Sequence, residues 1–182
     1  METFAPARDF VENPRYGQDR ADAVRRLDLA AIDVTIASLI AEFAAIPHCF
    51  TLQCCYGHFV WARGQDPRNL DPIPSDYTGT VRYRIAYIAF CIEKSDRGVA
   101  LREALSEVPR IDPEYIQFGS PDWFWRRWAN SYALQVEPTV HRFHDETRLD
   151  AGEARHIQKV RERFFERLTE VAHDARGSPP TI

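Results

Sequence analysis

The run VRYRIAYIAFCIE at residues 81–93 constrains the fold more than any other part of the chain. It is rich in β-branched and aromatic residues, which favour strands. Toward its end it is almost continuously apolar. A strand that is apolar on both sides has to be covered on both sides, so the run predicts a central strand of a sheet.

Patterns on both sides of this run predict the other elements. Apolar residues recur at helical spacing after Asp19, and Pro47 would end that helix. Its apolar stripe consists of Leu29, Ile32, Ile36, Leu39, Ile40 and Phe43. Ser95 or Asp96 can cap a second helix that ends near Val108. Further strands are expected at residues 49–55, 59–61, 114–119 and 131–137, with a helical turn within 120–128 and a last helix over about 150–174.

The order of these elements favours an α+β fold, because strands occur in runs between helices and do not alternate strictly with them. We expect one domain over residues 1–182, with a single mixed or mostly antiparallel sheet of about five strands and helices packed on one face. Residues 1–19 should form an extended arm. Residues 63–80 contain Pro67, Pro72 and Pro74 and predict a long loop that could act as a lid.

Charge and apolar length exclude several classes of partner. The net charge is −4, so the chain has no general attraction for DNA or for an anionic membrane. The longest apolar stretch, residues 32–46, is interrupted by polar side chains and is too short to span a bilayer. Residues 1–17 carry no secretory signal and the four cysteines form no CxxC pair, so we expect a cytoplasmic protein with reduced thiols.

Side-chain alternation predicts one polar face on the sheet. In the first strand Thr51, Gln53 and Cys55 should share a face, opposite Leu52 and Cys54. The polar face would also carry Tyr87, Glu93, Gln117, Gln135 and Glu137. Glutamine both donates and accepts hydrogen bonds, so this face could bind an amide, a base edge or a sugar. The alternative is the ordinary solvated face of an antiparallel sheet.

Residues 51–58 hold the densest group of reactive side chains. Cys55 and His58 could form a nucleophile and base pair, with Glu93 or Glu137 as an acidic third partner. The alternative is that Cys55 is a small buried hydrophobe and that Gly57 serves only the turn. Metal binding is a further alternative, with ligands from Cys54, Cys55, His58, His141 and His144. No zinc-site spacing is matched, so no metal is assigned.

The aromatic segment 120–128 carries three of the four tryptophans together with Arg126 and Arg127. Aromatic rings interleaved with arginine can stack on bases, or they can anchor a protein interface such as a homodimer. The third alternative is a cluster packed on the core with solvated arginines.

The stretch Phe50-Thr-Leu-Gln-Cys-Cys-Tyr-Gly-His-Phe59 resembles the Thr-Ser-Ser-Cys-Ser-Gly-Arg segment of the methyltransferase family that performs the third step of tRNA wybutosine synthesis. Thr51, Cys55 and Gly57 match, and His58 stands where that family has arginine. The resemblance implies an S-adenosylmethionine site near residues 51–58 and an RNA substrate. The Thr-x-x-x-Cys-x-Gly-His pattern also resembles a turn in uncharacterised prokaryotic proteins, to which no activity is attached.

These patterns favour a domain that binds a small molecule or nucleotide around residues 51–58 and the Gln/Glu face. The methyltransferase-like enzyme and the non-catalytic interaction protein are alternatives. The candidate catalytic residues are Cys55 and His58, and no particular cofactor is indicated. The expected ligand-binding residues are Thr51, Gln53, His58, Glu93, Gln117, Trp123, Gln135 and Glu137.

Overall fold

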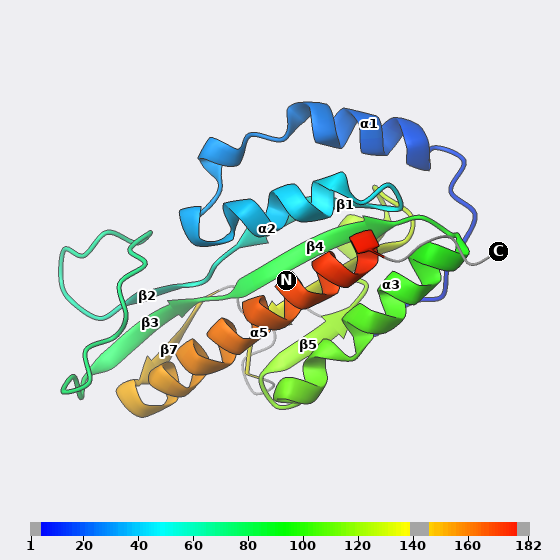
Figure 1. Ribbon diagram of the computed structural model, residues 1–182. Helices are drawn as coiled ribbons and strands as arrows, with labels where there is room; N and C mark the ends of the chain where they lie inside the picture. The colour runs from blue at the N-terminus through cyan, green and yellow to red at the C-terminus, as the bar shows by residue number, and fades with distance from the viewer. Residues whose placement is uncertain (1–4, 139–145, 178–182) are drawn as a thin grey trace.

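The computed structural model describes residues 5–138 and 146–177, which form two antiparallel sheets and a set of helices (Figure 1). The helices are α1 (Tyr16–Arg26), α2 (Val34–Ala45), α3 (Asp96–Ser106), α4 (Asp122–Trp125) and α5 (Ala151–Gly177), with 3-10 turns η1 (Leu29–Ala31) and η2 (Val108–Ile111). The strands are β1 (Cys49–Cys55), β2 (His58–Val60), β3 (Thr80–Arg84), β4 (Ala86–Ile92), β5 (Ile116–Gly119), β6 (Ser131–Val136) and β7 (Glu146–Asp150).

The α+β class predicted from the sequence is confirmed, but the sheet is divided. One sheet has the order β1-β4-β6-β5 and the other has the order β2-β3-β7. The described residues therefore form seven strands in two sheets, where one sheet of about five was expected. The run at 81–93 splits at Ile85 into β3 and β4. Its second half, β4, is central as predicted, because it pairs with both β1 and β6.

The split follows from two different patterns within the run. In β3 exposed and buried residues alternate, whereas every residue of β4 except Tyr87 is buried. The Tyr83 hydroxyl fixes the junction, because it accepts the Ala86 N–H at 3.0 Å and donates to the Val136 carbonyl at 2.7 Å. The two halves of one predicted strand consequently serve two sheets.

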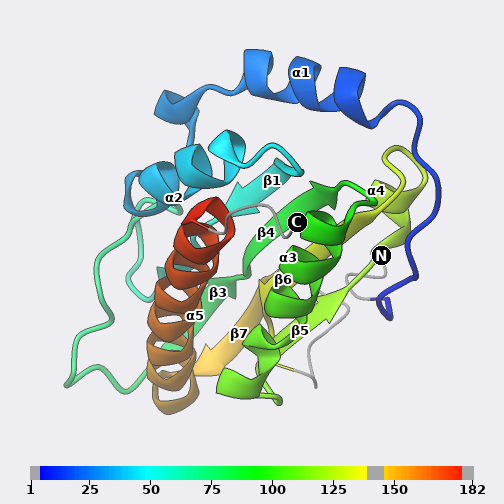
Figure 2. The same ribbon diagram turned by 45° about the vertical axis from the view of Figure 1, so that its right-hand side comes forward.

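Helices α2, α5 and α3 lie side by side over one face of the four-stranded sheet, as Figure 2 shows. The stripe predicted for α5 is buried in the main core: Ile157, Val160, Phe164, Leu168 and Val171. The same helix also packs against β3 and β7, so it covers the inner faces of both sheets. Within the described ranges, no helix combines the length and the apolar character that a membrane crossing requires.

The opposite face of the four-stranded sheet is covered in part, so helices pack on both faces and not on one. Tyr16 of α1 packs on Phe50 and Cys91. Phe124 of α4 packs on Ala89 and Ala133. Both helices contribute aromatic rings to a face that would otherwise expose apolar strand residues.

The helix predicted between Asp19 and Pro47 is interrupted. It consists of α1, η1 and α2, and the chain is extended at Leu27 and Ile32 between them. The Asp28 carboxylate accepts the Ala30 N–H and starts η1, which competes with a continuous helix. The interruption leaves Asp33 just outside α2.

The segments predicted to be irregular are an arm and a loop. The N-terminal arm is shorter than the predicted residues 1–19, because α1 begins at Tyr16; within the arm Pro6 pairs with Gly119 at the edge of β5. The loop between β2 and β3 packs against α5, since Gln158 accepts the Ile73 N–H and Arg155 donates to the Tyr77 carbonyl. Ile73 is buried in the main core. These contacts anchor Ile73 and Tyr77 to α5, and a role of the loop as a lid stays a prediction.

Candidate functional site

A β-bulge in β1 decides which side chains reach the site. Thr51 pairs with Phe90 and Gln53 pairs with Ala89, so the extra residue is Leu52. Directly paired residues share a face of the sheet. Thr51 therefore lies on the helix-covered face with Phe90, while Leu52 packs on the opposite face against Phe124 and its neighbours. The prediction that Thr51 shares a face with Gln53 and Cys55 is wrong for Thr51 and correct for the other two.

The turn after β1 is fixed by the backbone conformation of Gly57 and by two contacts of Arg161. Gly57 has a φ of 87°, and a Cβ there would lie 2.7 Å from the Ala86 Cβ, so the position requires glycine. Arg161 of α5 donates to the Gly57 carbonyl at 2.8 Å. The Arg161 guanidinium also lies 4.0 Å from the centre of the Tyr56 ring. Arg161 itself is buried, so this turn is tied to the long helix.

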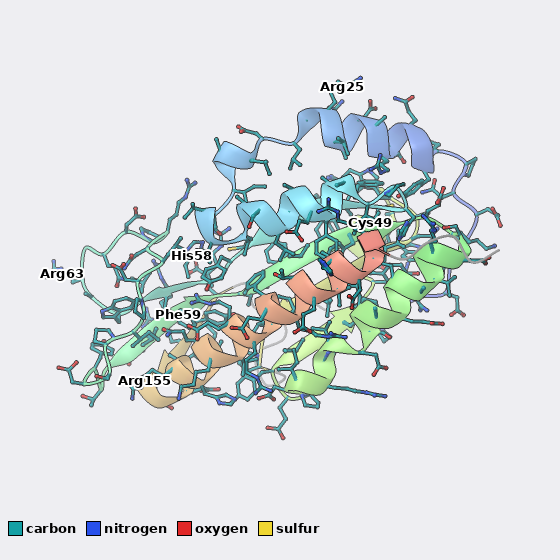
Figure 3. The ribbon with its side chains drawn as sticks, in the orientation of Figure 1. Arg25, Cys49, His58, Phe59, Arg63 and Arg155 are labelled. Carbon is teal, nitrogen blue, oxygen red and sulfur yellow. The ribbon has the colours of Figure 1, made fainter. Side chains whose placement is uncertain are left out.

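Asp33, Cys55 and His58 meet beside this turn. His58 Nε2 lies 3.4 Å from Asp33 Oδ2, and the Tyr56 N–H donates to the same oxygen at 2.8 Å. The Gly57 N–H points at the Cys55 sulfur at 3.4 Å. Cys55 and His58 are buried, and the side chain of Asp33 is 20% exposed. In Figure 3 His58 lies at the end of β1 remote from Cys49, near the loop that carries Arg63.

The contacts set the charges of this cluster. The hydrogen bond to Asp33, with a contribution from Cys55, raises the pKa of His58 to about 10. The hydrogen bond from His58 lowers the pKa of Asp33, and Tyr56 and Arg84 act in the same direction. The pair is therefore an imidazolium and a carboxylate at neutral pH. His58 Nδ1 is buried and has no hydrogen-bond partner among the described residues.

From Cys55 a row of side chains crosses the face of the sheet that is turned away from α5. Cys55 pairs with Tyr87, Tyr87 with Gln135, and Gln135 with Gln117. Gln135 donates to Glu137 Oε2 at 2.8 Å, and Gln117 donates to the Glu137 carbonyl at 3.1 Å. We call Cys55, Tyr87, Gln135, Gln117 and Glu137 the polar row.

Three members of the polar row, Gln117, Gln135 and Glu137, are buried. The interpretation of this face as an ordinary solvated surface is wrong for these three. It holds for Gln53, which is exposed and lies 3.4 Å from the Tyr87 hydroxyl. Buried amides that bond to each other hold fixed positions, so the row is a preorganised base under Tyr87 and Gln53.

An arginine face continues the same side of the molecule across the second sheet. Val81, Tyr83 and Ile85 are buried in the core. Arg82 and Arg84 alternate with them along the strand, so these two side chains point away from the core. Arg84 pairs with His58, and Arg82 pairs with Arg148 of β7. We call Arg82, Arg84 and Arg148 the arginine face. Glu146 offsets it in part, with a carboxylate oxygen 3.9 Å from Arg82 Nε.

The structure separates other predicted residues from the site. Glu93 follows the far end of β4, six residues from Tyr87, and a strand of that length spans about 20 Å. Trp123 is 53% exposed and lies under the Arg127 guanidinium, whose carbon is 3.7 Å from the ring centre. Phe124 packs inward, so the core-packed alternative holds for part of that segment. His141 and His144 lie outside the described residues.

Sequence reasoning missed Asp33 and Arg161, which contribute most to the turn. In the sequence Asp33 is one of the polar residues that interrupt the apolar stretch 32–46, and Arg161 is one of many charged residues in the last helix. A polar residue at the break between two apolar stripes was the one available signal for Asp33. For Arg161 no local signal exists, because its partner is 104 positions away.

Comparisons with known proteins bear on the fold. No protein-family model matches the chain, and no curated protein matches it. A solved structure of the PH1069 protein from Pyrococcus horikoshii OT3 superposes with a TM-score of 0.50 and 12% identity, covering 89% of this chain and 94% of that one. A second structure of the PH1069 protein from Pyrococcus horikoshii gives 0.47 and 12%, covering 90% and 93%. A hypothetical protein from Aeropyrum pernix gives 0.40 and 10%, covering 79% and 96%. The superposition with a TM-score of 0.50 shows that this chain and the PH1069 protein share a fold.

Proposed function

We propose that the chain binds a nucleotide, or a phosphorylated small molecule of similar size, on the side of the two sheets turned away from α5. The observation that carries this proposal is the continuity of the polar row with the arginine face. One end offers hydrogen bonds and an aromatic ring. The other end offers positive charge. A nucleotide carries the complementary groups in the same order, a base and sugar joined to a phosphate.

The base end of the proposed site is formed by Tyr87 and Gln53 above the buried amides. The Tyr87 ring is half-buried, so one part of it is fixed and another part is accessible. Aromatic rings on a sheet stack on bases, and a glutamine amide can pair with a base edge. Gln135 and Gln117 are expected to hold the floor of this end in place.

The phosphate end rests on the pairing of Arg82 with Arg148. Like charges directly opposite on neighbouring strands destabilise a sheet, and a bound phosphate would remove that repulsion. Arg84 lies two residues from Arg82 on the same side of β3. Glu146 competes with the phosphate for Arg82, so the expected affinity is moderate.

Isothermal titration with AMP, GMP, CMP and UMP tests this function. We expect at least one of them to bind, with affinity lowered about tenfold by Arg148→Ala, because a charged hydrogen bond contributes about 1.5–3 kcal/mol. Tyr87→Ala should weaken the same ligand, and His58→Ala should abolish binding while the far-ultraviolet circular dichroism is unchanged. Arg110→Ala is the control, because that side chain is 81% exposed on η2. Equal loss in the control, or no binding to the parent protein, would remove the proposal.

A second function, transfer of a methyl group from S-adenosylmethionine to RNA, is favoured by the resemblance over residues 51–58. Its matched glycine, Gly57, stands where only glycine fits, and its matched cysteine, Cys55, lies in the polar row. The arginine face supplies the local positive charge that the net charge of −4 does not. The test incubates the protein with total tRNA and methyl-labelled S-adenosylmethionine. Label in the RNA that Cys55→Ser removes and Cys54→Ser retains would support this function. Nucleotide binding without methyl transfer to RNA would support only the first of the two proposed functions.

A further inference from the structure

Three donors of different chemistry converge beside the Tyr56–Gly57 turn: a carboxylate oxygen of Asp33, the sulfur of Cys55 and an imidazole nitrogen of His58. Their ligand atoms all lie within 4.8 Å of one another. The nitrogen and oxygen of His58 and Asp33 are 3.4 Å apart. Ligands that surround a tetrahedral zinc ion at about 2.0–2.3 Å lie about 3.3–3.8 Å from each other. The Asp33–His58 distance falls within this range, and the Cys55 sulfur lies no more than 4.8 Å from either donor atom, so a modest approach of the sulfur would bring all three to one metal ion.

We propose that Asp33, Cys55 and His58 form a zinc site with one coordination position left for water or a bound ligand. The mixture of sulfur, nitrogen and oxygen selects the metal class, because calcium and magnesium prefer oxygen ligands alone. Three protein ligands with a free fourth position are typical of zinc sites that act on a ligand, whereas structural sites use four. Asp33 is the partly exposed member, so solvent reaches the cluster from its side.

The surroundings of the cluster contain groups that favour the metal and groups that oppose it. The Gly57 N–H donates toward the Cys55 sulfur, which stabilises a thiolate ligand. His58 Nδ1 has no partner among the described residues, so the ring is not fully committed by hydrogen bonds. Arg84 opposes a cation, since it pairs with His58 across β2 and β3 and acts on Asp33. A metal would take the place of the proton that His58 shares with Asp33.

The cluster lies between the polar row and the arginine face. Cys55 begins the polar row, and His58 is paired with the first residue of the arginine face, Arg84. The metal would thus stand where the two parts of the proposed ligand surface meet. Metal binding is nevertheless independent of the proposed nucleotide, because none of its ligands comes from that molecule. The two proposals can therefore fail separately.

The experiment uses the full chain under reducing conditions with zinc and cobalt as the only additions. After removal of metal with a chelator and dialysis against zinc, elemental analysis should find one zinc per chain. Cobalt should give the thiolate-to-cobalt charge-transfer absorption of a cysteine ligand. Cys55→Ser should abolish that absorption and weaken zinc binding at least about 100-fold, and Asp33→Asn should weaken it without removing the sulfur signal.

Cys54→Ser is the matched control. It changes the adjacent thiol, which lies on the helix-covered face because Cys54 pairs with Ile88. Circular dichroism and urea unfolding establish that each variant is folded. The proposal is overturned if the parent chain retains no stoichiometric zinc, if folded Cys55→Ser binds as the parent does, or if Cys54→Ser loses the metal equally. None of these measurements involves a nucleotide, so they leave the function proposed above to its own test.

Discussion

The two ends of the sheet face turned away from α5 carry the same residue type in opposite settings. At one end Cys91 lies with Phe50 under Tyr16 of α1, and burial raises the pKa of its thiol to about 12. At the other end Cys55 lies beside the His58 imidazolium and Asp33. The strands supply both cysteines in the same way. The difference lies in what approaches them, the buried Tyr16 ring at one end and charged groups at the other.

This contrast teaches how one sheet can serve both stability and chemistry. Where α1 and α4 cover it, the face carries Phe50, Ala89, Cys91 and Ala133, which add to the core. Along the polar row, buried polar side chains are held in place by hydrogen bonds to one another, as Gln135 is by Glu137. We therefore expect substitutions at the covered end to lower the free energy of unfolding and substitutions at the other end to lower the affinity for the ligand.

The largest expected effect is at the covered end. Phe50→Ala should lower the free energy of unfolding by about 3–5 kcal/mol, because it empties a fully buried site under Tyr16. Tyr87→Ala at the polar end should cost less than half of that, because its ring is only half-buried. Urea unfolding of both variants measures the difference. Equal losses would show that the two ends are packed alike.

A smaller effect separates buried from exposed glutamines within the polar end. Gln135→Ala should cost about 1–3 kcal/mol, because it removes the hydrogen bond that Gln135 donates to the buried Glu137 carboxylate. Gln53→Ala should change stability by less than about 0.5 kcal/mol, because Gln53 is exposed. If Gln135→Ala leaves the free energy of unfolding in urea unchanged, this end of the face is an ordinary solvated surface.

The ion pair at the site predicts a dependence of stability on pH. The pKa of His58 is raised from 6.5 to about 10, so its contribution is complete below pH 6.5 and is lost as the pH rises through about 10. The lowered pKa of Asp33 has the reverse effect in acid, where its contribution falls as the pH falls. With a chelator present, the difference in stability between the parent and His58→Gln should shrink by about 1 kcal/mol or more between about pH 6 and 10. A constant difference would contradict the ion pair.

An effect on stability as small as that of Gln53→Ala is expected at α4. Trp123→Ala should change the free energy of unfolding by less than about 0.5 kcal/mol, because the ring is 53% exposed. Its informative readout is the mass in solution as a function of concentration. Association that this variant abolishes would support the interaction function of the aromatic segment 120–128. A monomer at all concentrations would leave Trp123 without that role.

Elements governed by local patterns could be predicted from the sequence. The stripe of α5, the Ser95 cap of α3 and the apolar run of β4 each contain their own signal, and each is present in the structure. Strand β7 was missed because its sequence, ETRLD, is polar and has one buried residue. A short edge strand of this kind is specified by its neighbour β3 and not by its own composition.

The candidate site was only half predictable for a related reason. Cys55 and His58 are three positions apart in the chain, on either side of one turn, so their proximity could be predicted directly. The extra residue Leu52 shows itself only in the pairing of β1 with β4, and it moved Thr51 to the other face. Asp33 reaches His58 across 25 positions because the helix breaks before α2. Contacts that depend on tertiary structure left no local pattern.

Arg161 links the order of synthesis to the completion of the fold. The turn at Gly57 leaves the ribosome early, yet its carbonyl is satisfied by a side chain made 104 positions later. Until α5 emerges, β3 and β7 lack the helix that packs on them, and α2 and α3 cover the four-stranded sheet only in part. The nascent chain therefore passes through a stage in which the strands have been made but part of their apolar surface is uncovered, and a chaperone that binds such surfaces would be needed longest there. Release of α5 is then the step that closes the molecule.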